Sequence, residues 1–142
     1  MYIDPQDYDN WKDYAEAMMS AQLVDAENLT TDELIALIKG GQQDSILYIA
    51  LAKKKDIAKS APVLLAELRS FGNNEEGNDA MRSYVIEALY NLCGFKIANR
   101  NGEYEELFLS FAGKIQSETF NQSMNELEER INKILNKIAV KK

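Results

Sequence analysis

Hydrophobic residues recur at intervals of three and four along most of the chain, the spacing of helices with one buried face. The clearest stripe lies between residues 81 and 92 and consists of Met81, Tyr84, Val85, Ala88, Leu89 and Leu92. Comparable stripes predict further helices over about residues 5–22, 30–39, 46–55, 60–71, 103–115 and 121–138. No segment alternates apolar and polar residues as a half-buried strand does. The pattern therefore predicts an all-α protein of about seven helices.

Capping residues mark three of the predicted helix starts. Asp4-Pro5 suits the beginning of the first helix, because aspartate caps free N–H groups and proline lacks a donor that would be unpaired there anyway. Thr30 and Glu33 have the spacing of a capping box at the start of the second helix. The segment Ser60-Ala61-Pro62 is expected to open the fourth helix for the same reason as Asp4-Pro5.

The last predicted helix carries an apolar seam with alternating spacings of three and four. Its members are Met124, Leu127, Ile131, Ile134 and Ile138. The seam is shorter than three heptads, which favours docking onto the rest of the fold over a self-standing coiled coil. We therefore expect one domain over residues 1–142, with residues 121–142 as a docked C-terminal helix. A homodimer formed through this helix is the alternative.

An approximate internal repeat joins the middle helices. Residues 49–51 (IAL) match residues 87–89 (EAL) at a spacing of 38, and the partner helices are expected near Ser60 and Gly102. The runs ELIALIKGGQQDSILYIALAKKKD, APVLLAEL and NDAMRSYVIEALYNLCGF resemble alternating helices of the HEAT and armadillo superfamily. The resemblance covers about residues 33–116 and implies a short right-handed HEAT-like array that binds other proteins. An irregular helical bundle is the alternative architecture.

Charge is distributed unevenly along the chain. The net charge is -7, with ten acids and two bases in residues 1–50 and thirteen acids and fourteen bases in residues 51–142. An acidic front half repels phosphate backbones and anionic lipid, so nucleic-acid and membrane binding are disfavoured and a basic protein partner is favoured. No apolar run approaches the roughly 20 residues of a membrane span. We expect a cytoplasmic protein.

The residue types present argue against catalysis. The chain has no histidine, which excludes Ser-His-Asp chemistry, and its single cysteine, Cys93, lies on an apolar stripe with no histidine to activate it. Neither Gly77 nor Gly102 is preceded by the acids of a calcium-binding loop. Glycine-rich phosphate loops are also missing. The sequence therefore predicts no enzyme, no metal site and no cofactor.

The predicted function is binding of another protein through acidic and aromatic side chains. The candidate partner-binding residues are Asp7, Asp9, Trp11, Asp13, Asp32, Glu33, Glu67, Glu75, Glu76, Asp79, Glu103 and Glu106. The most concrete version is an acidic inhibitor, such as an immunity protein that neutralises a basic toxin nuclease, because carboxylates complement a basic cleft. The alternative is a HEAT-like adaptor or scaffold subunit that holds an extended peptide near Glu33, Glu67 and Glu106. Several of these acids also stand at helix starts, where the helix dipole alone accounts for them.

Overall fold

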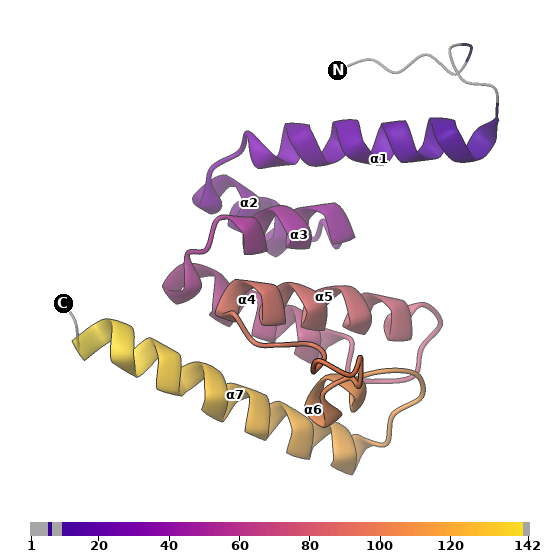
Figure 1. Ribbon diagram of the computed structural model, residues 1–142. Helices are drawn as coiled ribbons and strands as arrows, with labels where there is room; N and C mark the ends of the chain where they lie inside the picture. Colours follow the sequence, from indigo (N-terminus) through magenta and orange to yellow (C-terminus); the bar gives the residue numbers. More distant parts are fainter. Residues whose placement is uncertain (1–5, 7–9, 141–142) are drawn as a thin grey trace.

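The computed structural model describes residue 6 and residues 10–140, and this part of the chain is all-α, as predicted (Figure 1). It contains seven helices, together with one isolated β-bridge between Ala98 and Tyr104. The helices are α1 (Trp11–Glu27), α2 (Thr31–Lys39), α3 (Ser45–Lys53), α4 (Ile57–Ser70), α5 (Asn78–Cys93), α6 (Glu106–Leu109) and α7 (Ser117–Val140).

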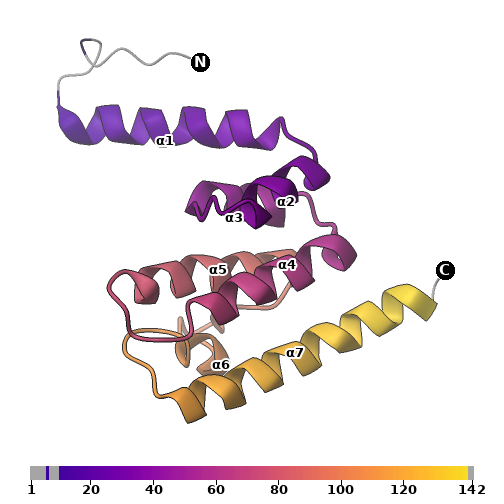
Figure 2. The same cartoon turned by 180° about the vertical axis from the view of Figure 1, so that it is seen from behind.

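The helices stack in two rows (Figures 1 and 2). One row consists of α1, α3 and α5, in which α3 packs against both of its neighbours. The second row consists of α2, α4 and α7, in which α4 packs against the other two. Contacts of α3 with α2 and α4, and of α4 with α5, join the rows around one hydrophobic core. The stack therefore ends in α1 on one side and in α6 and α7 on the other.

The capping box at the start of α2 is confirmed. The Thr30 hydroxyl accepts from the Glu33 backbone N–H at 3.1 Å, and the Glu33 carboxylate accepts from the Thr30 N–H at 2.9 Å. These bonds lower the pKa of Glu33 because they favour its charged form. The predicted start of the first helix at Asp4-Pro5 falls outside the described residues. The described helix α1 begins at Trp11, where Asn10 accepts from the Asp13 N–H, and it continues past residue 22 to Glu27 because no breaker precedes Asn28.

The predicted start of the fourth helix at residues 60–62 is wrong. Helix α4 begins at Ile57, where the Asp56 carboxylate caps the Lys59 N–H, so Pro62 lies inside the helix. A proline at this position removes the hydrogen bond to the Ala58 carbonyl, which lies in the first turn. The side chain of Pro62 is exposed, so no packing against another helix is disturbed.

The sixth helix predicted over residues 103–115 is reduced to the single turn α6. Backbone carbonyls beyond it are turned toward Arg82 of α5, whose Nε donates to the Phe111 oxygen at 3.1 Å and whose Nη2 donates to the Gly113 oxygen at 2.5 Å. Gly113 has a left-handed backbone with φ 65°, which ends helical geometry there. Helix α7 begins at Ser117, earlier than predicted, and it is α7 that packs beside α4. The predicted repeat partner near Gly102 is therefore wrong.

Arg82 joins the two loops at one end of the stack. Its side chain is fully buried, and Nη1 donates to the carbonyl oxygens of Phe71 and Asn73, each at 2.7 Å. With the two bonds to residues 111 and 113, the guanidinium reaches four backbone carbonyls on two segments far apart in the sequence. Burial lowers the pKa of Arg82, and the negative charge of Asp79 opposes this effect. Arg82 thus fixes the segment between α4 and α5 against the segment between α6 and α7.

Candidate functional site

A groove of about 380 Å³ runs along the outer face of the first row, between α3 and α5. Ala52 and Ala88 lie at its floor, where both side chains are almost fully buried. Ile49 of α3 and Tyr84 of α5 stand on either side, with 40% and 44% of their surfaces exposed. The groove therefore combines an apolar floor with two large apolar walls that the described part of the chain leaves partly exposed.

Helical spacing produces this groove from two stripes. On α3, Ile49 is followed by Ala52 and Lys53, three and four residues later, and on α5 Tyr84 is followed by Glu87 and Ala88 at the same intervals. Residues at these intervals share a helix surface. The small alanine side chains leave the space between the helices open. The sequence pattern predicted that Tyr84 lies on the buried stripe of its helix. This prediction is wrong, because none of the described helices covers Tyr84 at this face of α3 and α5.

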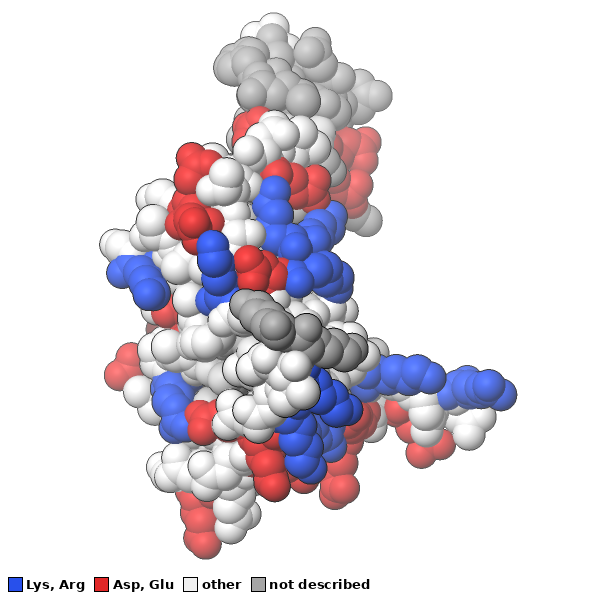
Figure 3. Space-filling view, turned by 90° about the vertical axis from the view of Figure 1, so that its left-hand side faces the viewer, with Lys and Arg blue, Asp and Glu red and all other residues white. Residues whose placement is uncertain are grey.

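Lysine side chains close one end of the groove, where the C-terminal ends of α1, α3 and α5 meet. Lys53 Nζ lies 2.6 Å from Glu27 Oε1, and Lys54 Nζ donates to the Glu27 backbone oxygen at 2.6 Å. Lys55 Nζ donates to the backbone oxygen of Asn91 in the last turn of α5. Figure 3 shows basic side chains gathered on this side of the molecule, with acidic side chains between them. The lysines stabilise three converging helix C-termini, whose carbonyls carry partial negative charge.

Lys55 adopts an unusual backbone conformation. Its φ is 59°, in the left-handed region, and it is the non-glycine residue with positive φ among the described residues. A side chain at such a position costs about 1 kcal/mol relative to glycine, which is the usual residue just beyond a helix. The conformation lets the chain turn from α3 into α4 and places the Lys55 ammonium group at the mouth of the groove.

The predicted partner-binding residues near the N-terminus are only partly described. Asp7 and Asp9 fall outside the described residues, as does the side chain of Trp11. Asp13 is exposed in the first turn of α1, where its carboxylate accepts from Asn10 Nδ2 at 3.1 Å. Of this group, the structure therefore places only Asp13 on a surface.

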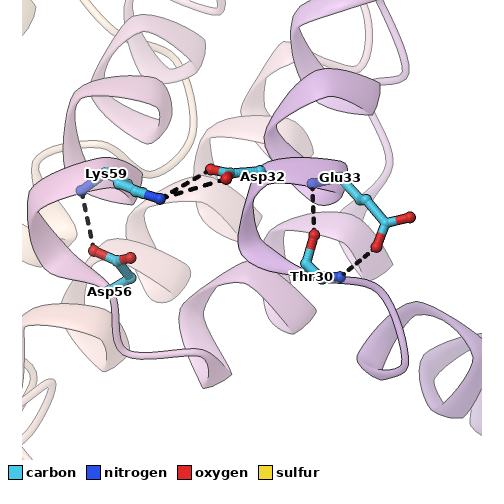
Figure 4. Close-up of polar contacts among 5 residues, drawn as sticks. All are labelled: Thr30, Asp32, Glu33, Asp56 and Lys59. Atoms are coloured by element: carbon cyan, nitrogen blue, oxygen red, sulfur yellow. Dashed lines mark hydrogen bonds and ion pairs between the residues drawn. The ribbon is translucent and has the colours of Figure 1, made fainter.

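Three predicted acids in the second row form contacts within the fold. Lys59 Nζ lies 3.2 Å from Asp32 Oδ1, and Glu33 belongs to the capping box (Figure 4). Glu67 is half-buried and accepts from the hydroxyl of the buried Tyr48 at 2.7 Å. Asp32 and Glu67 thus connect neighbouring helices and Glu33 caps α2, while the side chains of Asp32 and Glu33 remain exposed.

The structure brings Glu75, Glu76 and Asp79 together. They rim a hollow of about 230 Å³ above Arg82, at the loop between α4 and α5, and all three are exposed. Lys114 also lines this hollow. Of the predicted residues that the structure describes, these three exposed acids share one hollow.

The last two predicted acids lie near a network that the sequence did not reveal. Glu103 is exposed in the turn before α6, and Glu106 lines a hollow between α6 and α7. Between them, Glu105 accepts from the hydroxyl of buried Tyr90 at 2.7 Å and pairs with Arg130. Sequence reasoning missed Glu105 because its two partners come from α5 and α7, far away along the chain.

Reactive groups are sparse in the described part of the chain. Cys93 is half-buried, and burial raises the pKa of its thiol to about 11 while the positive charge of Lys55 opposes the shift. A thiol of this kind is almost entirely protonated at neutral pH and is a poor nucleophile. Within residues 10–140, no cluster of three or more histidine, cysteine or acidic side chains has the geometry to hold a metal. None of the described helices has the length and hydrophobicity needed to cross a bilayer.

Comparisons with known proteins found no relative of this chain. No family model, curated protein or solved structure matches this chain. The functional argument is therefore built on the residues and their geometry.

Proposed function

We propose that the chain is a non-catalytic protein-binding module that holds a segment of a partner protein in the groove between α3 and α5. The observation that carries this proposal is the exposure of Ile49 and Tyr84 on opposite sides of one apolar groove. Concave apolar sites with aromatic walls typically anchor a side chain of a bound partner. The two-row stack supports the HEAT-like class as part of the proposal, because such arrays present rigid surfaces to other proteins.

Selection from a displayed random-peptide library on the immobilised protein tests the groove. We expect selected peptides to lose about tenfold or more in affinity for the Ile49→Ala and Tyr84→Ala variants, because each removes an anchoring wall. Affinity is measured by titration calorimetry or fluorescence anisotropy. Leu109→Ala and Tyr104→Ala are matched controls, since these apolar residues are 49% and 58% exposed at other places. Peptides that bind the groove variants as tightly as the parent protein would contradict the proposal.

The acidic inhibitor is a second candidate, and a different observation favours it. Glu75, Glu76 and Asp79 form a compact exposed acidic group on a loop that Arg82 holds in place. A preformed set of carboxylates suits a basic protein surface, since little ordering is needed on binding. In this second proposal the chain neutralises a basic enzyme such as a nuclease.

Replacing this acidic group with neutral isosteres separates the two candidates. A variant with Glu75→Gln, Glu76→Gln and Asp79→Asn is compared with the parent chain for salt-sensitive capture of a basic nuclease and for inhibition of its activity. The inhibitor proposal predicts that both are lost in the variant, because carboxylate contacts set electrostatic affinity. A variant with neutral substitutions at Asp32 and Glu33 is the control. Equal inhibition by the parent chain, the loop variant and the control variant would exclude this role for the loop.

A further inference from the structure

The apolar stripe of α7 extends beyond the surface that covers it. Met124, Leu127 and Ile131 are fully buried, whereas Ile134 and Ile138, which continue the same stripe, are half-exposed and lie outside the hydrophobic core. Figures 1 and 2 show α7 crossing the end of the stack, with its last turns reaching past the rest of the second row. The final turns of α7 thus carry an apolar stripe that the rest of the described fold covers only in part.

The same turns are strongly basic. Residues 131–142 contain four lysines and no acid, in a chain whose net charge is -7. Lys133 and Lys137 are exposed, and Lys137 follows Ile134 by three residues, so the ammonium groups lie beside the apolar stripe. A symmetric pairing of two α7 ends would bring these lysines together and is disfavoured by repulsion. The apolar and basic surface at the end of α7 is instead complementary in charge to an acidic helix.

The opposite end of the stack supplies such a helix. Helix α1 contains four acids and one lysine, and Asp13, Glu16 and Val24 are exposed. Ala17 is half-exposed and follows Asp13 by four residues, so it shares the acidic face. Helix α1 lies at the end of the row and packs against α3. Its outward face is acidic with small apolar side chains between the carboxylates.

We propose that copies of this chain associate head to tail, with residues 131–140 of α7 in one copy on the outward face of α1 in the next. Charge complementarity supports this partner, because one chain carries both the basic and the acidic face at opposite ends of its stack. The contact joins two different surfaces, so it is heterologous and can continue beyond two copies. This association is independent of the α3–α5 groove, which lies on another face.

Sedimentation velocity over a range of protein concentrations tests the association. At about 0.1 M salt, where charges are screened over about 10 Å, we expect the average mass to rise above the 16.1 kDa of one chain as concentration increases. At about 1 M salt, where screening falls to about 3 Å, the mass should return toward one chain. A mass of one chain at every concentration, or one that stops at two chains, would overturn the head-to-tail proposal.

Complementary charge reversals identify the faces. Lys133→Glu with Lys137→Glu, and separately Asp13→Lys with Glu16→Lys, should each weaken self-association by about tenfold or more. A mixture of the two variants should associate again, because each supplies the face that the other still matches. Lys39→Glu with Lys114→Glu changes the net charge equally at other exposed positions and should associate more strongly than the α7 variant. Failure of the mixture to associate would contradict the assignment of faces, and melting curves of all variants confirm folding.

Discussion

Replacing Arg82 with methionine should destabilise the protein by about 3–5 kcal/mol, because several backbone carbonyls lose their hydrogen-bond donor and each such loss costs about 1–3 kcal/mol when the carbonyl is buried. The change leaves four backbone carbonyls, those of Phe71, Asn73, Phe111 and Gly113, without the guanidinium that they now share. For a chain of this length, such a loss lowers the melting temperature by about 10 °C or more. Calorimetry or thermal circular dichroism measures the change.

Arg69→Met is the matched control for this prediction. Arg69 is a partly exposed arginine whose side chain pairs with Glu128 of α7, and exposed pairs of this kind contribute at most about 1 kcal/mol. Hydrogen exchange adds a local readout, since the loops before α5 and before α7 should lose protection in the Arg82 variant. If the two variants melt at similar temperatures, Arg82 is not the main connection between these loops.

Stability should fall as pH rises above about 10, the ordinary pKa of tyrosine, because two buried tyrosines keep their protons in the folded state. Burial, the hydrogen bond to Glu67 and the charge of Glu67 all raise the pKa of Tyr48. Burial and the hydrogen bond to Glu105 raise the pKa of Tyr90, while Arg130 opposes the shift. Their contribution is fully present below pH 10 and is lost at higher pH, by about 1.4 kcal/mol per pH unit for each tyrosine.

Urea unfolding between about pH 9 and about pH 12 measures this slope around the tyrosine pKa. The Cys93→Ala background is used because the pKa of this thiol, raised to about 11, gives a slope of the same sign. Tyr48→Phe with Tyr90→Phe should flatten the fall, and Tyr84→Phe, which changes an exposed tyrosine, is the comparison variant. A double variant with the same pH slope as its parent would show that these hydroxyls do not titrate differently on unfolding.

Local signals in the sequence predicted much of the helical structure. The capping box formed by Thr30 and Glu33 was identified because both partners lie within one turn. The predictions failed where a distant residue determines the local conformation. The sixth helix had a helical stripe, but its last carbonyls bind Arg82 of α5, and a short turn replaced it. One failure was local: Pro62 was predicted to start its helix, but the helix begins earlier because Asp56, six residues before Pro62, caps its first turn.

The candidate site depended still more on tertiary structure. The acids predicted to bind a partner were chosen by their charge, and the structure uses several of them inside the fold, as with Glu67 and Tyr48. The exposure of Tyr84 could not be predicted, because its spacing matches that of the buried residues beside it. A stripe shows which side chains share a helix face, but only the packing of neighbouring helices decides whether that face is covered.

The sequence by itself determined the all-α class, most of the helices and the acidic character of the first half, since these follow from spacing, capping and composition. Only the tertiary structure decided the two-row stack, the α3–α5 groove and the contacts of Arg82 and Glu105. The physical reason is that helix formation depends on residues within one or two turns, whereas burial and hydrogen bonding between helices depend on residues brought together from distant parts of the chain.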